Sequence, residues 1–275
     1  MFGKFTVISI VAGLATFTQS YTAFSAHSEE LQNLIAENHR AYMPSEIGLF
    51  PTVVVIPGCS GVALESSEAE VAITQLTEDD LLFRAHYPRF AKRLSNEGFA
   101  VYLIDILTSE GLITACGDSV PAQRIAQYID AAIAWVKTRP SVDASDIHII
   151  GFSMGGKGSL AWLHGPRKEA SSVQSVTTVY PQCRDRKPLN IAIPVLMLLG
   201  DADDIADPMV CDALVDISPI KGLITVHHYT GARHGFDIQG APSVLDIGNG
   251  MTVGYQETAA NDAWKELTLF IGHKP

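Results

Sequence analysis

The sequence of 275 residues lacks the marks of several common protein classes. Beyond residue 26 it has no apolar run long enough to cross a bilayer, so we expect no transmembrane segment there. Positive charge is scarce, because 19 lysines and arginines stand against 30 aspartates and glutamates and no basic stripe occurs. A nucleic acid partner is therefore not expected, since nothing would neutralise its phosphates. Zinc-ligand spacings, phosphate loops and dinucleotide fingerprints are also absent, so we expect no metal and no cofactor.

The first 26 residues differ from the rest of the chain. They hold one charge, Lys4, followed by the apolar stretch Phe5–Phe17 and then by small polar residues. This order is typical of a secretory signal peptide, here cleaved near Ser25 or Ala26. An uncleaved anchor is the alternative, but the apolar stretch is short and interrupted by polar residues. We expect a signal peptide at 1–26 and a periplasmic or secreted mature protein at 27–275, without stable membrane association.

Cysteine is also rare, and all four cysteines follow the expected signal peptide: Cys59, Cys116, Cys183 and Cys211. An even number in an exported protein permits two disulfides. Cys59 and Cys116 each follow a predicted strand, and Cys183 and Cys211 lie near two other strand ends. We therefore expect Cys59 to pair with Cys116 and Cys183 with Cys211. The alternative is that the thiols are free and packed as small hydrophobic groups.

Strand-like and helix-like segments alternate after the first 50 residues. The expected strands are Thr52–Ile56, Ala100–Asp105, Asp146–Phe152, Val173–Pro181, Val195–Leu199 and Ile224–Tyr229. The expected helices are Tyr87–Glu97, Pro121–Lys137, Gly155–His164, Met209–Ile217 and Asn261–Ile271, with a further helix in the segment Glu29–Ile47. This alternation predicts one α/β domain over 27–275, with a mostly parallel sheet covered by helices on both faces.

The segment Gly151-Phe152-Ser153-Met154-Gly155 stands between a predicted strand and a predicted helix. A G-x-S-x-G sequence in that setting predicts a nucleophile elbow, in which a sharp turn presents the serine to a substrate. A chance match is the alternative, and the position between strand and helix argues against it. We therefore expect Ser153 to be a nucleophile.

A serine hydroxyl needs a base and an acid that orients the base, in the chain order Ser, Asp, His. The strand Val195–Leu199 leads into a loop with four aspartates, and Ile224–Tyr229 leads into a loop with His234. Because the carboxyl ends of parallel strands meet at one sheet edge, these loops are expected beside Ser153. We assign His234 as the base, and the alternative is an ordinary loop histidine.

The acid comes from the aspartate-rich loop. Asp207 precedes Pro208 at an expected helix start, where it would act as an N-cap. Of the others we choose Asp203, with Asp201 and Asp204 as alternatives. The strand Thr52–Ile56 ends in a glycine-rich turn whose Cys59 or Ser60 amide would stabilise an oxyanion, together with the amide of Met154.

These residues resemble the dienelactone hydrolase family of α/β-hydrolases. The resemblance rests on Pro57-Gly58-Cys59-Ser60-Gly61, Gly151-Phe152-Ser153-Met154-Gly155-Gly156, the Gly200-x-x-Asp203 loop and Ala232-Arg233-His234-Gly235-Phe236. It covers about Thr52 to Ile271 and implies an α/β-hydrolase fold. It also implies Ser153, Asp203 and His234 as nucleophile, acid and base, and Cys59 and Met154 as the oxyanion amides.

Two positions depart from the family's namesake. Ser153 stands where the namesake has a cysteine, which resembles the serine esterases of the family. The chain also continues Phe236-Asp237-Ile238-Gln239 where the namesake has an arginine that holds a substrate carboxylate. These departures favour hydrolysis of simple esters over the dienelactone substrate.

Arg124 lies near the start of its predicted helix and is a candidate clamp for a substrate carboxylate. The alternative is a structural ion pair with Asp118 or Asp105. Taken together, the residues predict an exported hydrolase that cleaves carboxylic esters or lactones through an acyl-serine intermediate. An acyltransferase or small-peptide peptidase with the same triad, or a non-catalytic binding module, remain alternatives.

Overall fold

The computed structural model of the protein describes residues 28–62, 77–116, 120–184 and 187–272. A seven-stranded sheet has the order β1-β3-β2-β4-β5-β6-β7. Strand β1 is antiparallel to β3, and all other neighbours are parallel. The strands are β1 (His39–Tyr42), β2 (Phe50–Ile56), β3 (Ala100–Ile104), β4 (Val142–Phe152), β5 (Val173–Val179), β6 (Val195–Gly200) and β7 (Ile224–Tyr229). The predicted mostly parallel α/β architecture is confirmed.

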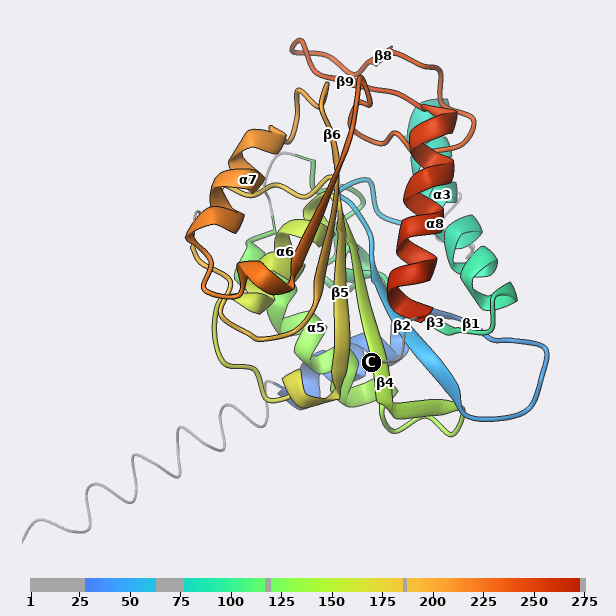
Figure 1. Ribbon diagram of the computed structural model, residues 1–275. Coiled ribbons are helices and arrows are strands. Elements are labelled where there is room, and N and C mark those ends of the chain that lie inside the picture. The colour runs from blue at the N-terminus through green and yellow to red at the C-terminus, as the bar shows by residue number, and fades with distance from the viewer. Residues whose placement is uncertain (1–27, 63–76, 117–119, 185–186, 273–275) are drawn as a thin grey trace, which may run out of the picture.

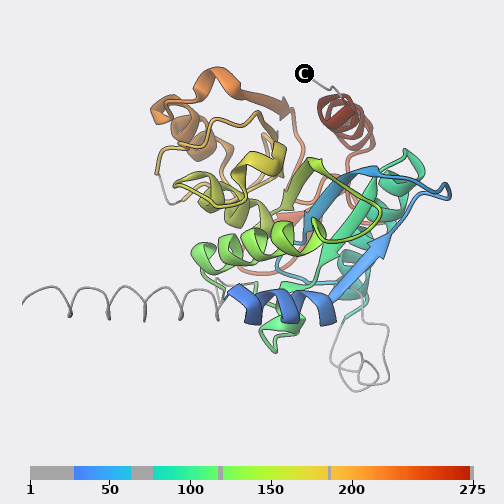
Figure 2. The same cartoon turned by 90° about the horizontal axis from the view of Figure 1, so that it is seen from below.

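Helices cover both faces of this sheet (Figure 1). They are α3 (Glu78–Asn96), α4 (Ile106–Ser109), α5 (Ala122–Val136), α6 (Met154–Leu163), α7 (Pro208–Ile217) and α8 (Glu257–Gly272), with one more at 28–37. Because side chains alternate along a strand, Val53 and Val55 pack with α3 and α8, whereas Val54 and Ile56 pack with α5 and α6. The helix at 28–37 joins the second layer, where it runs beside α5 (Figure 2).

Two helices differ clearly from their expected bounds. Helix α3 begins at Glu78, nine residues before the expected start, and Pro88 lies inside it. A capping box of Thr77 and Asp80 fixes this start, since each satisfies a backbone N–H of the other. The expected leading helix ends at residue 37, where the chain turns into β1 and extends the sheet beside β3.

The expected signal peptide, 1–26, lies outside the described residues. Within the described part of the chain, no helix is long and apolar enough to span a bilayer. A short antiparallel pair, β8 (Leu245–Asp246) and β9 (Thr252–Val253), follows β7 at the sheet edge where β6 ends (Figure 1). Sequence patterns did not predict this pair.

Candidate active site

Ser153 lies between β4 and α6 in a strained backbone conformation, with φ 48° and ψ −110°. Such angles are costly for a residue with a Cβ atom and persist only where the surroundings enforce them. The surroundings here are tight, because a Cβ at Gly151 would collide with Ser159 and one at Gly155 with the Ile56 carbonyl. The two glycines let α6 approach β2 and β4, and the turn between them has the geometry of a nucleophile elbow.

A chain of hydrogen bonds joins the three residues expected to form a triad. His234 Nε2 lies 2.8 Å from Ser153 Oγ, and His234 Nδ1 lies 2.7 Å from Asp203 Oδ2. All three side chains belong to buried residues. A carboxylate only accepts, so Nδ1 carries the proton and Nε2 is the atom that accepts from the serine hydroxyl. The arrangement can deprotonate Ser153 and hold the resulting imidazolium.

The four aspartates after β6 have four different partners. Asp203 Oδ1 accepts from the Ile205 and Ala206 amides at 2.9 and 2.7 Å, which leaves Oδ2 for His234. Asp201 instead bonds to His228, and Asp204 bonds to Thr252 and pairs with Arg233. Asp207 caps α7 through the Met209 amide, as expected. Of these carboxylates, the structure brings only Asp203 to His234, and its catalytic role stays a prediction.

Two backbone N–H groups belong to segments next to the elbow, one at the start of α6 and one in the turn after β2. Met154 is the first residue of α6, so its N–H has no partner within the helix and lies at the positive end of the helix dipole. The β2 turn is held by Tyr87, whose hydroxyl accepts from the Gly58 N–H at 2.9 Å. A Cβ at Gly58 would lie 3.4 Å from Ser153 Cβ, so this turn passes directly beside the nucleophile.

The Cys59 carbonyl points away from the site, because it accepts from the Ala115 amide at 2.9 Å and from the Thr114 hydroxyl. Among the described residues, no protein group accepts a hydrogen bond from the Cys59 N–H. The amides of Cys59 and Met154 are thus the two candidates for an oxyanion hole. Sequence reasoning missed Tyr87, which carries no local signal apart from its place in a helix that packs on the sheet.

A second buried network lies behind His234. The Tyr180 ring is 4.6 Å from the His234 ring, and its hydroxyl donates to Asp237 at 2.8 Å. Asp237 also pairs with His86, at 3.2 Å. Burial alone would raise the pKa of Asp237, but His86 and the Tyr180 hydroxyl lower it below its usual value. Asp237 is therefore an anion whose partners lie within the protein.

Arg124 has a carboxylate partner within the protein. Its Nε lies 2.7 Å from Glu110 Oε1, which also accepts from the Tyr128 hydroxyl at 2.7 Å. Of the two partners considered from sequence, Asp105 instead caps α4, whereas Asp118 lies outside the described residues and its pairing with Arg124 stays a prediction. The role of Arg124 in substrate binding stays a prediction.

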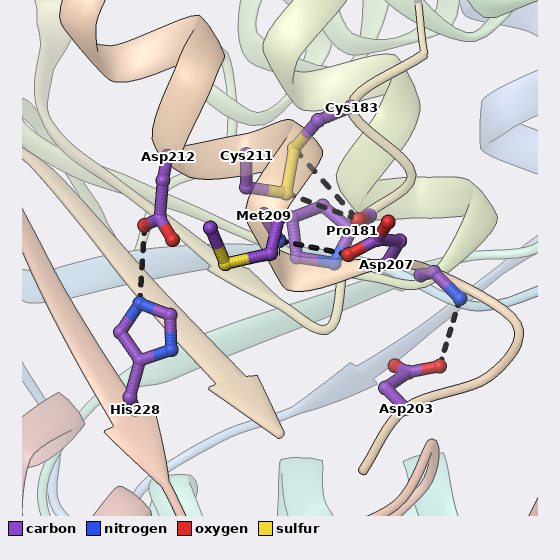
Figure 3. Close-up of a disulfide and its surroundings, with 9 residues drawn as sticks. Pro181, Cys183, Asp203, Asp207, Met209, Cys211, Asp212 and His228 are labelled. Carbon is purple, nitrogen blue, oxygen red and sulfur yellow. Dashed lines mark hydrogen bonds and ion pairs between the residues drawn. A yellow bond between two sulfur atoms is a disulfide. The ribbon is translucent and has the colours of Figure 1, made fainter. Parts of the chain in front are cut away.

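The structure contains both expected disulfides, Cys59–Cys116 and Cys183–Cys211. The first ties the β2 turn to the segment after α4. The second ties the segment after β5 to the first turn of α7, next to the loop that carries Asp203 (Figure 3). Both cross-links therefore constrain loops that form the site.

Comparisons with known proteins agree with this geometry. The sequence model of the dienelactone hydrolase family matches residues 83–274. A curated protein of Methylorubrum extorquens, provisionally named a carboxymethylenebutenolidase, is 23% identical over 94% of this chain and 88% of its own length.

Two solved structures share the fold. One is a protein of Klebsiella pneumoniae provisionally named a dienelactone hydrolase, with a TM-score of 0.62 and 18% identity over 86% of this chain and 92% of that one. The other, from metagenomic libraries, is described as a dienelactone hydrolase-like promiscuous phosphotriesterase. It has a TM-score of 0.64 and 19% identity over 85% of this chain and 91% of that one.

Proposed function

Since the chain belongs to the dienelactone hydrolase family, we propose that it is an exported serine hydrolase that cleaves carboxylic esters or lactones. One observation carries the proposal: the hydroxyl of a strained Ser153 bonds to His234, which bonds to a buried Asp203. This is the arrangement that activates a serine for acyl transfer.

The reaction proceeds in two steps. His234 Nε2 takes the Ser153 proton while Oγ attacks the ester carbonyl carbon, and the carbonyl oxygen becomes an oxyanion that accepts from the Cys59 and Met154 amides. When this intermediate collapses, the imidazolium gives its proton to the leaving alkoxide and an acyl-serine remains. In the second step His234 activates a water molecule, which releases the acid and restores the hydroxyl. With a lactone, the leaving alcohol stays attached to the acyl group.

Asp203 keeps Nδ1 protonated and stabilises the imidazolium in both steps. Its buried carboxylate has a fixed orientation because its other oxygen accepts from two backbone amides. Tyr180 packs against the His234 ring and limits its rotation. The protein thus supplies orientation and charge stabilisation, and the chemistry needs only its own side chains and water.

Export is the second part of the proposal. It is supported by the signal-like order of residues 1–26 and by two disulfides, which form and persist in oxidising compartments. We accordingly assign 1–26 as signal peptide and 27–275 as a single hydrolase domain in the periplasm or outside the cell.

A fluorophosphonate probe tests the mechanism, because only an activated serine is labelled. Mass spectrometry should find the label on Ser153, and Ser153→Ala should lower kcat/KM on short-chain esters by about 10³-fold or more with unchanged circular dichroism. The chain offers a matched control in Ser175, whose hydroxyl lies 2.8 Å from His148 Nδ1, while His148 pairs with Asp146. That serine lies inside strand β5 and not in an elbow, so the Ser175→Ala variant should still be labelled on Ser153 and should keep its activity.

Other outcomes separate the alternatives. No labelling, together with no hydrolysis of any ester, lactone, peptide or phosphotriester substrate, would indicate a binding module and contradict the proposal. Labelling with faster turnover when an alcohol or amine is added would indicate an acyltransferase. Labelling with preferred cleavage of peptides would indicate a peptidase. A panel of short and long acyl esters and lactones then defines the substrate.

A further inference from the structure

We propose that His227, Asp262 and Glu266 bind a first-row divalent metal ion such as Zn²⁺ between the edge strand β7 and the helix α8. The three side chains each offer one ligand atom, and these atoms all lie within 4.8 Å of one another. His227 Nε2 is 3.7 Å from Glu266 Oε2. The site is separate from the proposed triad and involves none of its residues.

Local geometry directs these groups toward one point. Asp262 and Glu266 are four residues apart on α8, so they share one face of the helix. His227 and Tyr229 alternate with His228 along β7 and point to the α8 side, whereas His228 bonds to Asp201 and to Asp212 on α7. One imidazole and two carboxylates are ligands that Zn²⁺ accepts.

The distances suit a small rearrangement on binding. Ligand atoms around tetrahedral zinc lie about 3.4 Å apart for bonds near 2.1 Å, so the 3.7 Å between His227 and Glu266 is nearly right and the widest spacing must contract by up to about 1.4 Å. Asp262 is exposed, and His227 and Glu266 are half-buried, so close packing does not prevent the three side chains from adjusting. A cavity of about 450 Å³ lined by His227 and Glu266 gives an ion a path from solvent.

The buried hydroxyl of Tyr229 is an independent indication of a ligand. Tyr229 is 8% exposed, and its hydroxyl has no hydrogen-bond partner of normal geometry. Burial raises the pKa of Tyr229, and the carboxylates of Asp262 and Glu266 raise it further, so this hydroxyl lies beside the same cluster. Asp262 is close enough to this hydroxyl to act as a poorly aligned acceptor, and a metal ion bound by Asp262, or its water, would give the hydroxyl a partner of normal geometry.

Charge also favours a cation here. Two carboxylates four residues apart on one helix face repel each other, in a chain with a formal net charge of −11. Lys265 approaches Glu266 at 3.8 Å, but its side chain is mostly exposed and offers little compensation. Bound metal would neutralise the carboxylates and fasten α8 to β7, the strand that leads to the His234 loop.

The test measures thermal unfolding of full mature protein after treatment with EDTA and dialysis. Excess ZnCl₂ should raise the melting temperature by roughly 5 °C or more, whereas MgCl₂ should leave it nearly unchanged. The rise should be lost in His227→Gln and in Asp262→Asn. His228→Gln is the matched control, because this neighbouring histidine also contacts two carboxylates but on the opposite face, and it should keep the rise.

Asp262→Asn keeps the test decisive, since this side chain is exposed and its substitution removes the repulsion from Glu266, so the metal-free variant should melt close to wild type. An absent rise in the wild type would overturn the proposal. So would an equal rise in His227→Gln and Asp262→Asn, or its loss in His228→Gln alone. The readout does not depend on hydrolysis, and repeating it in Ser153→Ala separates this site from the proposed triad.

Discussion

Asp203, the proposed acid, differs from its neighbouring aspartates in the backbone hydrogen bonds that it accepts. Asp201 and Asp204 each have partners elsewhere, in His228 and Thr252. Asp203 has a fixed orientation because its Oδ1 accepts hydrogen bonds from the Ile205 and Ala206 amides. A carboxylate held in this way can orient an imidazole without moving during the reaction.

Replacing these aspartates one at a time should therefore give very unequal effects. Asp203→Asn should lower kcat by about 10²-fold or more, since an amide no longer fixes the His234 tautomer or stabilises imidazolium. Asp201→Asn and Asp204→Asn should stay within a few-fold of wild type. Steady-state kinetics on one ester compares the three variants, and a larger loss in Asp201→Asn would refute the assignment.

Among individual residues, the sequence predicted the candidate catalytic residues at strand ends but not the buried residues that contact them. Ser153 and His234 follow recognisable strands, so their convergence is a consequence of parallel topology. Tyr180, Asp237 and His86 come from three distant parts of the chain and meet only after the sheet and α3 are packed. No local pattern encodes such a contact. The proposed metal ligands are equally dispersed, between β7 and α8.

Among the elements, α3 contacts the turn after β2, which carries the proposed Cys59 oxyanion amide, through Tyr87. Burial raises the pKa of Tyr87 to about 12, so its hydroxyl is neutral at working pH and accepts from the Gly58 amide. The contact fixes the peptide that precedes Cys59. Helix α3 therefore has a positioning role in the site although none of its residues belongs to the triad.

Tyr87→Phe should expose this role. The Gly58 N–H would be buried without an acceptor, and the turn would shift to satisfy it, so kcat should fall by about tenfold while KM changes little. Tyr128→Phe is a suitable control, because it also removes a buried hydroxyl bond, to Glu110, but away from the β2 turn. Equal losses of kcat in both variants would indicate general destabilisation instead.

The contact between β7 and α7 should make stability depend on pH. Burial alone would lower the pKa of His228, but hydrogen bonds to Asp201 and Asp212 outweigh it and raise the pKa above the usual 6.5. A raised pKa means that protonated His228 stabilises the fold fully below pH 6.5, and that this contribution disappears as pH rises through the folded-state pKa.

His228→Gln should thus lower the melting temperature at pH 5 to 6 and have no effect near pH 9. The shift should be small, because the side chain is about one-third exposed. Melting curves of wild type and variant across this range provide the measurement. A difference that grows with pH would contradict the sign of the predicted shift.

Element bounds were least predictable where tertiary context overrides local signals. Helix α3 begins nine residues before the expected start at Tyr87, because its cap at Thr77 and its packing on β3 stabilise the longer form. The residues of β1 fell within the segment predicted as a leading helix, because the pairing with β3 that makes them a strand has no signal in the local sequence. The central strands were predictable because short, continuous apolar runs are typical of strands buried on both faces of a parallel sheet.

Across the whole molecule, the two disulfides link the stability of the fold to the geometry of the site. They close loops with sequence separations of 57 and 28 residues. Chain entropy gives each a contribution of about 4 kcal/mol, slightly more for the longer loop. The Cys59–Cys116 bridge restrains the peptide that carries a proposed oxyanion amide, whereas Cys183–Cys211 restrains the start of α7.

Removing the two bridges separately should therefore show that both stabilise the fold and that only one affects catalysis. Both double variants, Cys59→Ser with Cys116→Ser and Cys183→Ser with Cys211→Ser, should lose roughly 2 to 5 kcal/mol of unfolding free energy in urea titrations. Only the first should also lower kcat at a temperature where both are folded, because serine keeps the amide at 59 but releases its loop. Protein recovered from an oxidising compartment should have no free thiol. Four free thiols there, or equal kcat values in the two variants, would contradict the link between export, cross-linking and the oxyanion hole.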